Sequence, residues 1–185
     1  MIIETPRLLL RPLELSDLEG MWELDSNPKV HRYLGNQPVT EKAFLETVIH
    51  RVQKQVQENG FGRFAVEWKE TGAFVGWAGL KLVKEPLNGK MEYVNVGYRL
   101  LERFWNQGIG FEAAWHSLNF GFSTLRLKEI YASAQHENIA SNRILKKCGM
   151  TLIQEYEEDQ SLVNEYRITL EEWLINSSHS EFHKD

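Results

Sequence analysis

The sequence predicts an α/β fold, with a mixed and mostly antiparallel sheet of seven strands flanked by about four helices. Helical periodicity and strict alternation of apolar and polar residues replace each other along the 185 residues. Three alternating runs, 61–68, 73–83 and 91–101, follow one another with short connections, which is typical of an antiparallel meander. A glycine-rich turn then leads directly into a helix, as in a strand–turn–helix unit.

The elements before the meander are short. Residues 7–13 form a predicted strand that Pro12 ends. Ser16 and Glu19 have the spacing of a capping box, so a helix is expected to follow through about residue 24. A short helical turn is expected at 29–35, and a longer helix with an apolar stripe at 40–60.

After the meander, the alternation and periodicity predict a helix that ends near Ser123, a strand, a second helix and two final strands. These last four are expected at 128–135, 138–147, 150–158 and 161–170. No linker or repeat divides the chain. Residues 1–172 are therefore expected to form a single domain, and residues 173–185 a polar C-terminal tail.

Composition excludes several classes of protein. Hydrophobic residues make up 42% and charged residues 25%, as in a globular domain. The N-terminus lacks the pattern of a signal peptide, and no run of apolar residues is long enough for a membrane span. A single cysteine, Cys148, favours a cytoplasmic protein. The net charge of -5 argues against direct nucleic-acid binding. The histidines show no metal-ligand spacing, so no metal is expected, and the chain is expected to be a monomer or homodimer.

The glycine-rich turn at 106–110 has the form of an anion site. The first amides of a helix lack partners, and glycine lets a pyrophosphate approach them. Gly108 to Ala113 also matches the dinucleotide fingerprint, with Glu129 near the position of a ribose-binding acid. That fingerprint belongs to a parallel, doubly wound sheet, whereas an antiparallel meander precedes this turn. Coenzyme A is therefore the preferred ligand.

The pantetheine arm of coenzyme A could pair with the edge of a strand, as peptides add to sheets. This requires one strand to splay from its neighbour near the middle of the sheet. The run 91–101 is the candidate, and Gly97 in its interior predicts a bulge there.

Three stretches stand out, in this order along the chain: TPRLLLRPLELSDLEGM, VGYRLLERFWNQGIGFEAAW and ASAQHENIASNRILKKCGM. Together they resemble the GNAT superfamily of acetyl-coenzyme-A-dependent N-acetyltransferases, and within it the branch of ribosomal-protein N-terminal acetyltransferases. The resemblance implies a GNAT-like fold and acetyl-CoA as co-substrate. It covers nearly everything between residues 5 and 170. Where the broader superfamily has arginine or glutamine at the start of the loop motif, this chain has Trp105.

The resemblance also implies the cofactor-binding residues. Main-chain atoms of Tyr98, Arg99 and Leu100 would hold the pantetheine arm and the acetyl carbonyl. The side chain of Asn138 would fix the arm from the far side of the splay. The amides that would hold the pyrophosphate are those of Asn106, Gln107, Gly108, Ile109, Gly110 and Phe111.

The residue expected to protonate the leaving thiolate differs from the one common in the superfamily. Many members place a tyrosine seven residues after the asparagine that opens the helix, where this chain has Leu145. Ser141, one turn into the same helix, is the expected replacement. The alternative is that its hydroxyl binds a carbonyl of its own helix. The amide near Leu100 is the expected oxyanion donor.

The general base is less well defined by the sequence. The branch often has a glutamate where this chain has Asn95, and Glu92 is the nearest candidate. Glu112 follows the glycine turn, where a carboxylate favours the helix dipole, so a structural role is expected. The acidic run from Glu155 to Asp159 is expected either to attract a cationic substrate or to be a solvated turn.

The sequence therefore indicates an N-acetyltransferase that acts on a primary amine. A protein N-terminal α-amino group, as in a ribosomal protein, is the leading acceptor. A small-molecule amine such as a polyamine, an amino acid or an antibiotic is the alternative. A non-catalytic acyl-CoA-binding module is a third possibility, because the superfamily tyrosine is missing.

Overall fold

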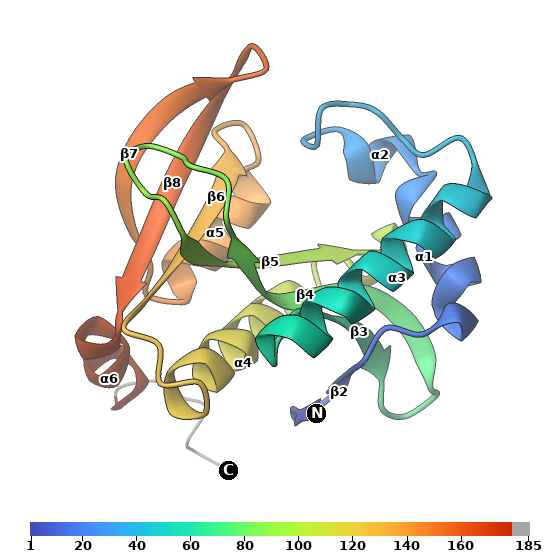
Figure 1. Cartoon of the computed structure of the whole chain (residues 1–185), viewed down its shortest axis with the longest axis horizontal. Helices are drawn as coiled ribbons and strands as arrows, with labels where there is room; N and C mark the ends of the chain where they lie inside the picture. The colour runs from blue at the N-terminus through green and yellow to red at the C-terminus, as the bar shows by residue number, and fades with distance from the viewer. Residues whose placement is uncertain (179–185) are drawn as a thin grey trace.

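The computed structural model, which describes residues 1–178, has one sheet of eight strands in the order β1-β2-β3-β4-β5-β6-β8-β7 (Figure 1). All neighbours are antiparallel except β5 and β6, which are parallel. The seven predicted strands are present, and a short β1 precedes them. The strands are β1 (Ile3–Glu4), β2 (Leu8–Arg11), β3 (Arg63–Trp68), β4 (Ala73–Val83), β5 (Tyr93–Leu100), β6 (Glu129–Gln135), β7 (Thr151–Glu158) and β8 (Ser161–Thr169).

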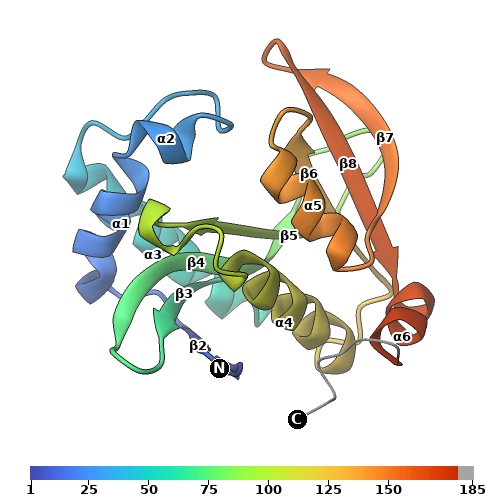
Figure 2. The same ribbon diagram turned by 180° about the vertical axis from the view of Figure 1, so that it is seen from behind.

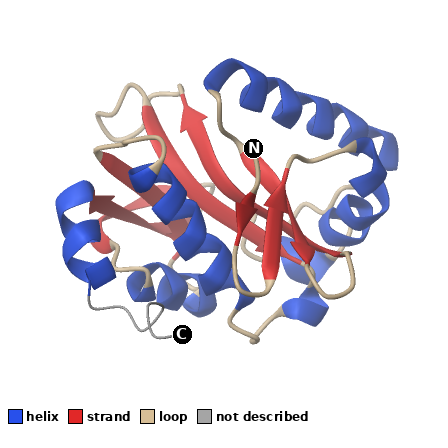
Figure 3. Ribbon diagram, turned by 90° about the horizontal axis from the view of Figure 1, so that it is seen from below, coloured by secondary structure: helices blue, strands red, loops and turns tan. Residues whose placement is uncertain are grey.

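Helices cover both faces of the sheet (Figure 3). Six α-helices are present among the described residues, where about four were expected. They are α1 (Leu18–Asp25), α2 (Pro28–His31), α3 (Lys42–Asn59), α4 (Ile109–Ser123), α5 (Ile139–Lys147) and α6 (Leu170–Ser178). Short 3-10 helices at Leu15–Asp17 and Glu102–Phe104 precede α1 and α4. Viewed from behind, α4 and α5 lie side by side (Figure 2).

The polar tail that was expected from residue 173 is wrong for residues 173–178, which are helical. Residues 170–178 form α6, and Trp173 is only 3% exposed. Its indole packs against Trp115 and Phe122 of α4, so the gain from burying a large aromatic ring orders the segment. Residues 179–185 lie outside the described part of the chain.

The core follows the alternation of the strands. In β3, Phe64 and Val66 belong to a cluster with Ile109 and Ala113 of α4, on one face of the sheet. The residue between them, Ala65, packs with the α1–α3 layer on the other face. The sheet therefore separates two helical layers, with α1–α3 on one face and α4 and α5 on the other.

The meander of β3, β4 and β5 is confirmed, but the bulge expected at Gly97 is wrong. The β4–β5 register runs without interruption from the Gly76–Leu100 pair to the Val83–Tyr93 pair. A register shift lies instead in β3, between Val66 and Glu67.

The capping box before α1 lies two residues earlier than predicted. The side chain of Glu14 accepts from the third residue of the 3-10 turn, and the Asp17 carboxylate accepts from the Glu14 amide at 2.9 Å. Asp17 Oδ1 also accepts a hydrogen bond from Arg11 Nη2 at 2.8 Å, in an ion pair. The buried ion pair makes Asp17 the better partner, so Ser16 is not the cap.

Glu112 ties the N-terminal strand to α4. It is 3% exposed, and its carboxylate accepts from the Thr5 hydroxyl at 2.6 Å, the Arg7 amide at 2.9 Å and Arg7 Nε at 2.7 Å. Burial raises the pKa of Glu112, but the hydrogen bonds from Thr5 and Arg7 outweigh burial, so its pKa lies below the usual value. The expected structural role of Glu112 is what the structure shows.

We expect Glu112→Gln to lower the free energy of unfolding at pH 7 by about 1–3 kcal/mol, the cost of weakening charged, buried hydrogen bonds. Because the folded-state pKa is depressed, this stability is present above the ordinary glutamate pKa of 4.5 and is lost as the pH falls through the folded value. The difference in melting temperature between parent and variant should therefore shrink at acid pH.

The control is Glu171→Gln, which removes the same charge from the first turn of α6, where the side chain is exposed. Its melting temperature should stay within about 1 °C of the parent at every pH, as for a surface change. Equal behaviour of the two variants would contradict a stabilising role for Glu112.

Candidate active site

The site begins where β5 and β6 separate. The two strands share one paired position, Asn95 with Tyr131, and no ladder joins them beyond it among the described residues. Leu101 N donates to Val75 O at 2.9 Å, which directs odd-numbered residues of β5 toward β4. The main-chain groups of Tyr98 and Leu100 therefore face the gap. The splay predicted from the sequence is present.

The main chain of Arg99 does not face this gap. Its carbonyl oxygen lies 2.1 Å from the point that a β-carbon on Gly76 would occupy, so it points at β4. The expected role of Arg99 main-chain atoms in holding a pantetheine arm is therefore not supported. Its side chain pairs with Asp25 of α1, on the face that α1–α3 cover.

The predicted anion loop lies at the start of α4. Gly108 is the N-cap residue with φ of +75°, a backbone conformation that residues with a β-carbon rarely adopt. Residues 106–108 are exposed, whereas Ile109, Gly110 and Phe111 are buried and begin the helix. The loop thus presents the first amides of α4 toward solvent, with the positive end of the helix dipole behind them.

Two side chains hold this loop in place. Arg7 Nη1 donates to Gln107 O at 2.9 Å, and the same guanidinium pairs with Glu112. Trp105 Nε1 donates to Leu100 O at 2.8 Å, which fixes the loop to the end of β5. Neither contact was predicted from the sequence, because each joins residues whose proximity depends on the sheet.

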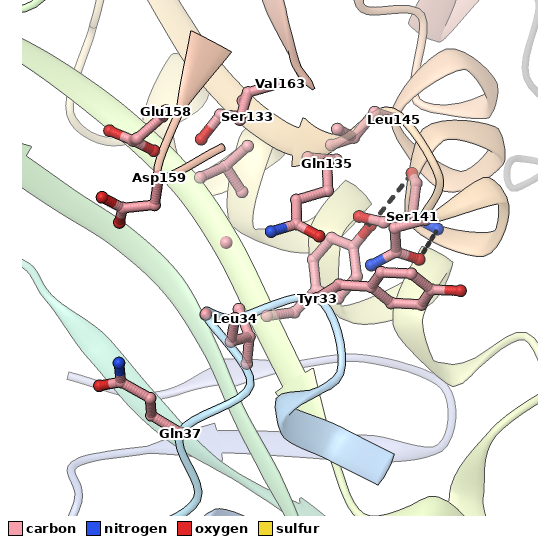
Figure 4. Close-up of a pocket in the computed structure, with 16 residues that line it drawn as sticks. Tyr33, Leu34, Gln37, Ser133, Gln135, Ser141, Leu145, Glu158, Asp159 and Val163 are labelled. Carbon is pink, nitrogen blue, oxygen red and sulfur yellow. Dashed lines mark hydrogen bonds between the residues drawn. The ribbon is translucent and has the colours of Figure 1, made fainter. Parts of the chain in front are cut away.

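A cavity of about 420 Å³ lies at the gap (Figure 4). Its walls come from β5, β6, the start of α5, the segment after α2 and the turn between β7 and β8. The lining residues are Tyr33, Leu34, Gly35, Gln37, Val96, Gly97, Tyr98, Ser133, Ala134, Gln135, Asn138, Ser141, Leu145, Glu158, Asp159 and Val163.

Ser141 and Asn138 both reach the cavity from the start of α5. Asn138 caps the helix, and its Oδ1 accepts from Ser141 N at 3.1 Å. The Ser141 hydroxyl lies 3.0 Å from the Tyr98 hydroxyl (Figure 4), and among the described residues it makes no hydrogen bond to a carbonyl of its own helix. Burial raises the pKa of Tyr98 well above its usual value, and the contact with Ser141 opposes this only in part. Tyr98 is therefore protonated at neutral pH.

A buried amide network fixes the start of α5 against the sheet. Asn142 Nδ2 donates to Gln135 O at 2.9 Å and to Asn138 O at 2.8 Å. Its Oδ1 accepts from Asn164 Nδ2 at 2.8 Å and from the Tyr166 hydroxyl at 2.6 Å. Asn142 stands one position after Ser141, and no feature of the sequence distinguished it from an ordinary helical asparagine.

Glu92, which was predicted as the general base, is not one of the carboxylates that line the cavity. Glu92 is exposed, precedes β5 and is absent from the cavity lining. At about 3.3 Å per residue, it lies roughly 13 Å along the chain from Val96, the first residue of β5 that lines the cavity. A base at Glu92 is therefore not supported. Glu158 and Asp159 line the cavity instead, on the side away from Ser141 (Figure 4).

The single cysteine of the chain is not part of the cavity lining. Cys148 is 3% exposed, and burial raises the pKa of its thiol to about 12, so the thiolate is not available. Within residues 1–178, no group of three or more histidine, cysteine or acidic side chains is arranged to hold a metal ion. In the same part of the chain, every helix is too short or too polar to span a lipid bilayer.

The arrangement fits a ligand with an amide-bearing arm and a diphosphate. The edge of β5 offers donors and an acceptor in the gap, and the exposed amides at Gly108 offer an anion site. Both lie along the path from the cavity to the start of α4. These are the features that an acyl-coenzyme A requires.

Comparison with known proteins agrees with this arrangement. Residues 7–151 match the family model of the acetyltransferase (GNAT) domain. An uncharacterized N-acetyltransferase p20 from Bacillus licheniformis is 29% identical over 170 residues, which cover 90% of this chain and 93% of that protein. Spermidine N(1)-acetyltransferase from Escherichia coli K12 is 25% identical over 175 residues, covering 95% and 89% of the two chains.

Solved structures share the fold. A GNAT-family acetyltransferase from Bacillus anthracis superposes with a TM-score of 0.78 at 23% identity, covering 92% of this chain and 99% of that one. Spermidine N-acetyltransferase from Vibrio cholerae, in complex with CoA and spermine, gives 0.74 at 20% identity, with coverages of 92% and 99%. RimL, a ribosomal L7/L12 α-N-protein acetyltransferase, gives 0.74 at 20% identity, with coverages of 91% and 94%. The chain therefore belongs to the GNAT family of acetyltransferases.

Proposed function

We propose that this acetyltransferase transfers the acetyl group of acetyl-CoA to a primary amine, and foremost to an α-amino group. The observation that carries the proposal is the cavity at the strand gap. One wall of the cavity is the bare edge of β5, and another is the acidic turn of Glu158 and Asp159. A thioester held along the strand edge and an amine drawn to the carboxylates would meet there.

The residues that would hold acetyl-CoA follow from the geometry. Tyr98 and Leu100 direct main-chain groups into the gap, where they would bind the amide arm, and Asn138 lies on the opposite wall. The amides from Asn106 to Phe111 would bind the diphosphate, beginning with those of the exposed residues 106–108. When bound, acetyl-CoA supplies an activated acyl group. We assign the Leu100 amide to stabilise the negative charge that develops on the acetyl oxygen.

The acceptor amine must lose a proton to become a nucleophile. An α-amino group has a pKa of about 7.7–8.0, so part of it is neutral at pH 7.5, whereas the lysine side chain, near 10.4, is almost entirely charged. Glu158 and Asp159 are the carboxylates of the cavity, and they would take up the proton through water. This modest base suits an α-amino group better than a lysine side chain.

Ser141 is the residue that we assign to protonate the departing thiolate. Its hydroxyl faces the cavity and can accept a hydrogen bond from the protonated Tyr98 while its own proton points elsewhere. Tyr98, from β5, thus brings a phenol next to α5 although the helix itself has Leu145 where many relatives have tyrosine. In this scheme Tyr98 is a positioning residue.

Two kinds of acceptor remain. The likeness to RimL supports a protein N-terminus, and the spermidine acetyltransferases together with the acidic turn support a polyamine. The deciding experiment measures thiol release from acetyl-CoA over a panel of N-terminal peptides, polyamines and amino acids. We expect turnover with at least one α-amino acceptor. Tight acetyl-CoA binding without turnover on any amine would instead identify a non-catalytic acyl-CoA-binding module.

We expect Gly108→Ala to weaken acetyl-CoA binding about 10-fold or more, because the added methyl group strains the backbone and covers the loop amides. Calorimetric titration with acetyl-CoA measures the change. Gly60→Ala is the matched control, since Gly60 has φ of +76° at the end of α3, with open space around it. An equal loss of affinity in both variants would mean that backbone strain alone explains the effect.

We expect Ser141→Ala to lower kcat about 10- to 100-fold with little change in the Kd of acetyl-CoA. The loss stays near the lower end for a general acid, since a thiolate with an ordinary thiol pKa leaves readily. Ser123→Ala, which removes an exposed hydroxyl from α4, is the control. A Ser141→Ala variant with the parent's kcat would remove this residue from the mechanism.

A further inference from the structure

Arg63 is a cation without a carboxylate partner beside the active-site cavity. From β3, its Nη1 donates to Gly79 O at 2.7 Å and its Nη2 donates to Asn95 Oδ1 at 3.1 Å. The guanidinium also lies 5.0 Å from the centre of the Trp77 ring. Both hydrogen-bond acceptors are neutral, and no ion pair of Arg63 exists within residues 1–178.

Gly97 brings this guanidinium to the cavity. A β-carbon on Gly97 would lie 2.5 Å from Arg63 Nη1 and 2.8 Å from Nη2, so a side chain there would displace the guanidinium from its present position. Gly97 lines the cavity, next to Tyr98. The glycine at position 97 thus accommodates the Arg63 side chain instead of forming the predicted bulge. Part of the Arg63 surface remains exposed.

The surroundings of Arg63 carry an excess of positive charge. Arg99 lies over the same Trp77 ring, 5.2 Å from its centre, and its charge is matched by Asp25. Burial first, and then the charge of Arg99, lowers the pKa of Arg63 to about 9. A half-buried cation without a counter-charge is unfavourable, so an anion bound beside it gains free energy. Arg7, Arg11 and Arg103 each have such an anion within the protein.

We infer that Arg63 binds a carboxylate of the acceptor, placed close to the amine that is acetylated. Of its five N–H donors, two are used within the protein, which leaves donors for a carboxylate. Arg63 is not itself a lining residue of the cavity, but it lies against Gly97, which is, so the site has two poles: Arg63 beneath Gly97 for the anion, and Glu158 with Asp159 for the ammonium group.

The geometry limits where the carboxylate can stand. The amine has to reach the gap at Tyr98 and Ser141, and Gly97 is the residue next to Tyr98 along β5. The carboxylate is therefore within a few bonds of the amine, as in a free amino acid or an N-terminal aspartate or glutamate. A polyamine lacks this anion and would place a positive charge near Arg63. The inference rests on the proposed function and selects within its α-amino acceptors.

The test compares acceptors of matched shape that carry or lack the carboxylate, with kcat/KM expressed per unprotonated amine. Purified full-length enzyme is assayed with free L-amino acids against their amides, and with peptides that begin with aspartate or glutamate against asparagine or glutamine. We expect kcat/KM to be at least about 10-fold higher for the carboxylate of one of these pairs, the size of a charged hydrogen bond. The amino-acid arm and the peptide arm distinguish the two sources of the anion.

Two variants then assign the preference to Arg63. Arg63→Gln removes the cation, and Asn95→Asp keeps Arg63 in place but supplies a carboxylate at its Nη2. In both, the ratio of kcat/KM for the acid to that for its amide should fall toward one. Arg51→Gln, an exposed arginine of α3, should keep the parent's ratio. If Arg63→Gln fails to fold, Asn95→Asp carries the test.

A parent enzyme that acetylates amines without preferring the acid in either arm would overturn the inference and leave the proposed function intact. A preference that persists in both variants would also overturn it. If no amine is acetylated, the proposed function fails, and the inference is judged on binding. Free amino acids should then raise the melting temperature of the parent with CoA more than their amides do, and equal shifts would reject Arg63 as a carboxylate site.

Discussion

The separation of β5 from β6 beyond the Asn95–Tyr131 pair is the constraint on which the site depends. Main-chain amides and carbonyls seldom remain without partners, because an unpaired polar group costs free energy. A sheet that opens in its middle carries this cost at Tyr98 and Leu100. Trp105 satisfies the carbonyl of Leu100, and either solvent or a ligand has to satisfy the other groups, so the opening creates a binding edge inside a sheet that is otherwise paired.

Side chains on both sides keep the gap open. The ring of Tyr98 ends at Ser141 of α5, so the start of that helix lies where continued strand pairing would otherwise lie. The buried amide of Asn142 holds the helix there through hydrogen bonds to both β6 and β8 residues. At the far end of β5, the indole of Trp105 binds the carbonyl of Leu100. The gap is thus a supported structure rather than a frayed edge.

The charged side chains around the cavity come from two parts of the sheet, with the acidic ones on one side of the gap and the basic ones on the other. Glu158 ends β7 and Asp159 begins the turn that follows it, whereas Arg63 and Arg99 lie on the meander, over the ring of Trp77. On the opposite face of the sheet, Arg7 links the anion loop to Glu112 and so to the N-terminal strand. The glycine loop and the cavity therefore have separate electrostatic supports.

The sequence alone determined the elements and the glycine turn before α4, since these depend on local patterns. Alternation identified the meander, and glycine at position 108 identified the left-handed turn before α4, because that backbone conformation excludes a β-carbon. Helix ends were less well predicted: the capping box at Glu14 rests on a pairing of Asp17 with Arg11, and α6 depends on burial of Trp173.

Only the tertiary structure decided which polar side chains meet at the gap. Tyr98 and Ser141 are 43 positions apart, and Arg63 and Asn95 are 32 apart, so no local pattern relates them. The strand register places Arg63 on Gly97 and turns the main chain of Arg99 toward β4. Glu92 comes directly before the strand that contains Gly97, yet the rise of that strand keeps the carboxylate out of the cavity. Chemistry that depends on contacts between distant segments is set by sheet order and register, which the sequence specifies only through the whole fold.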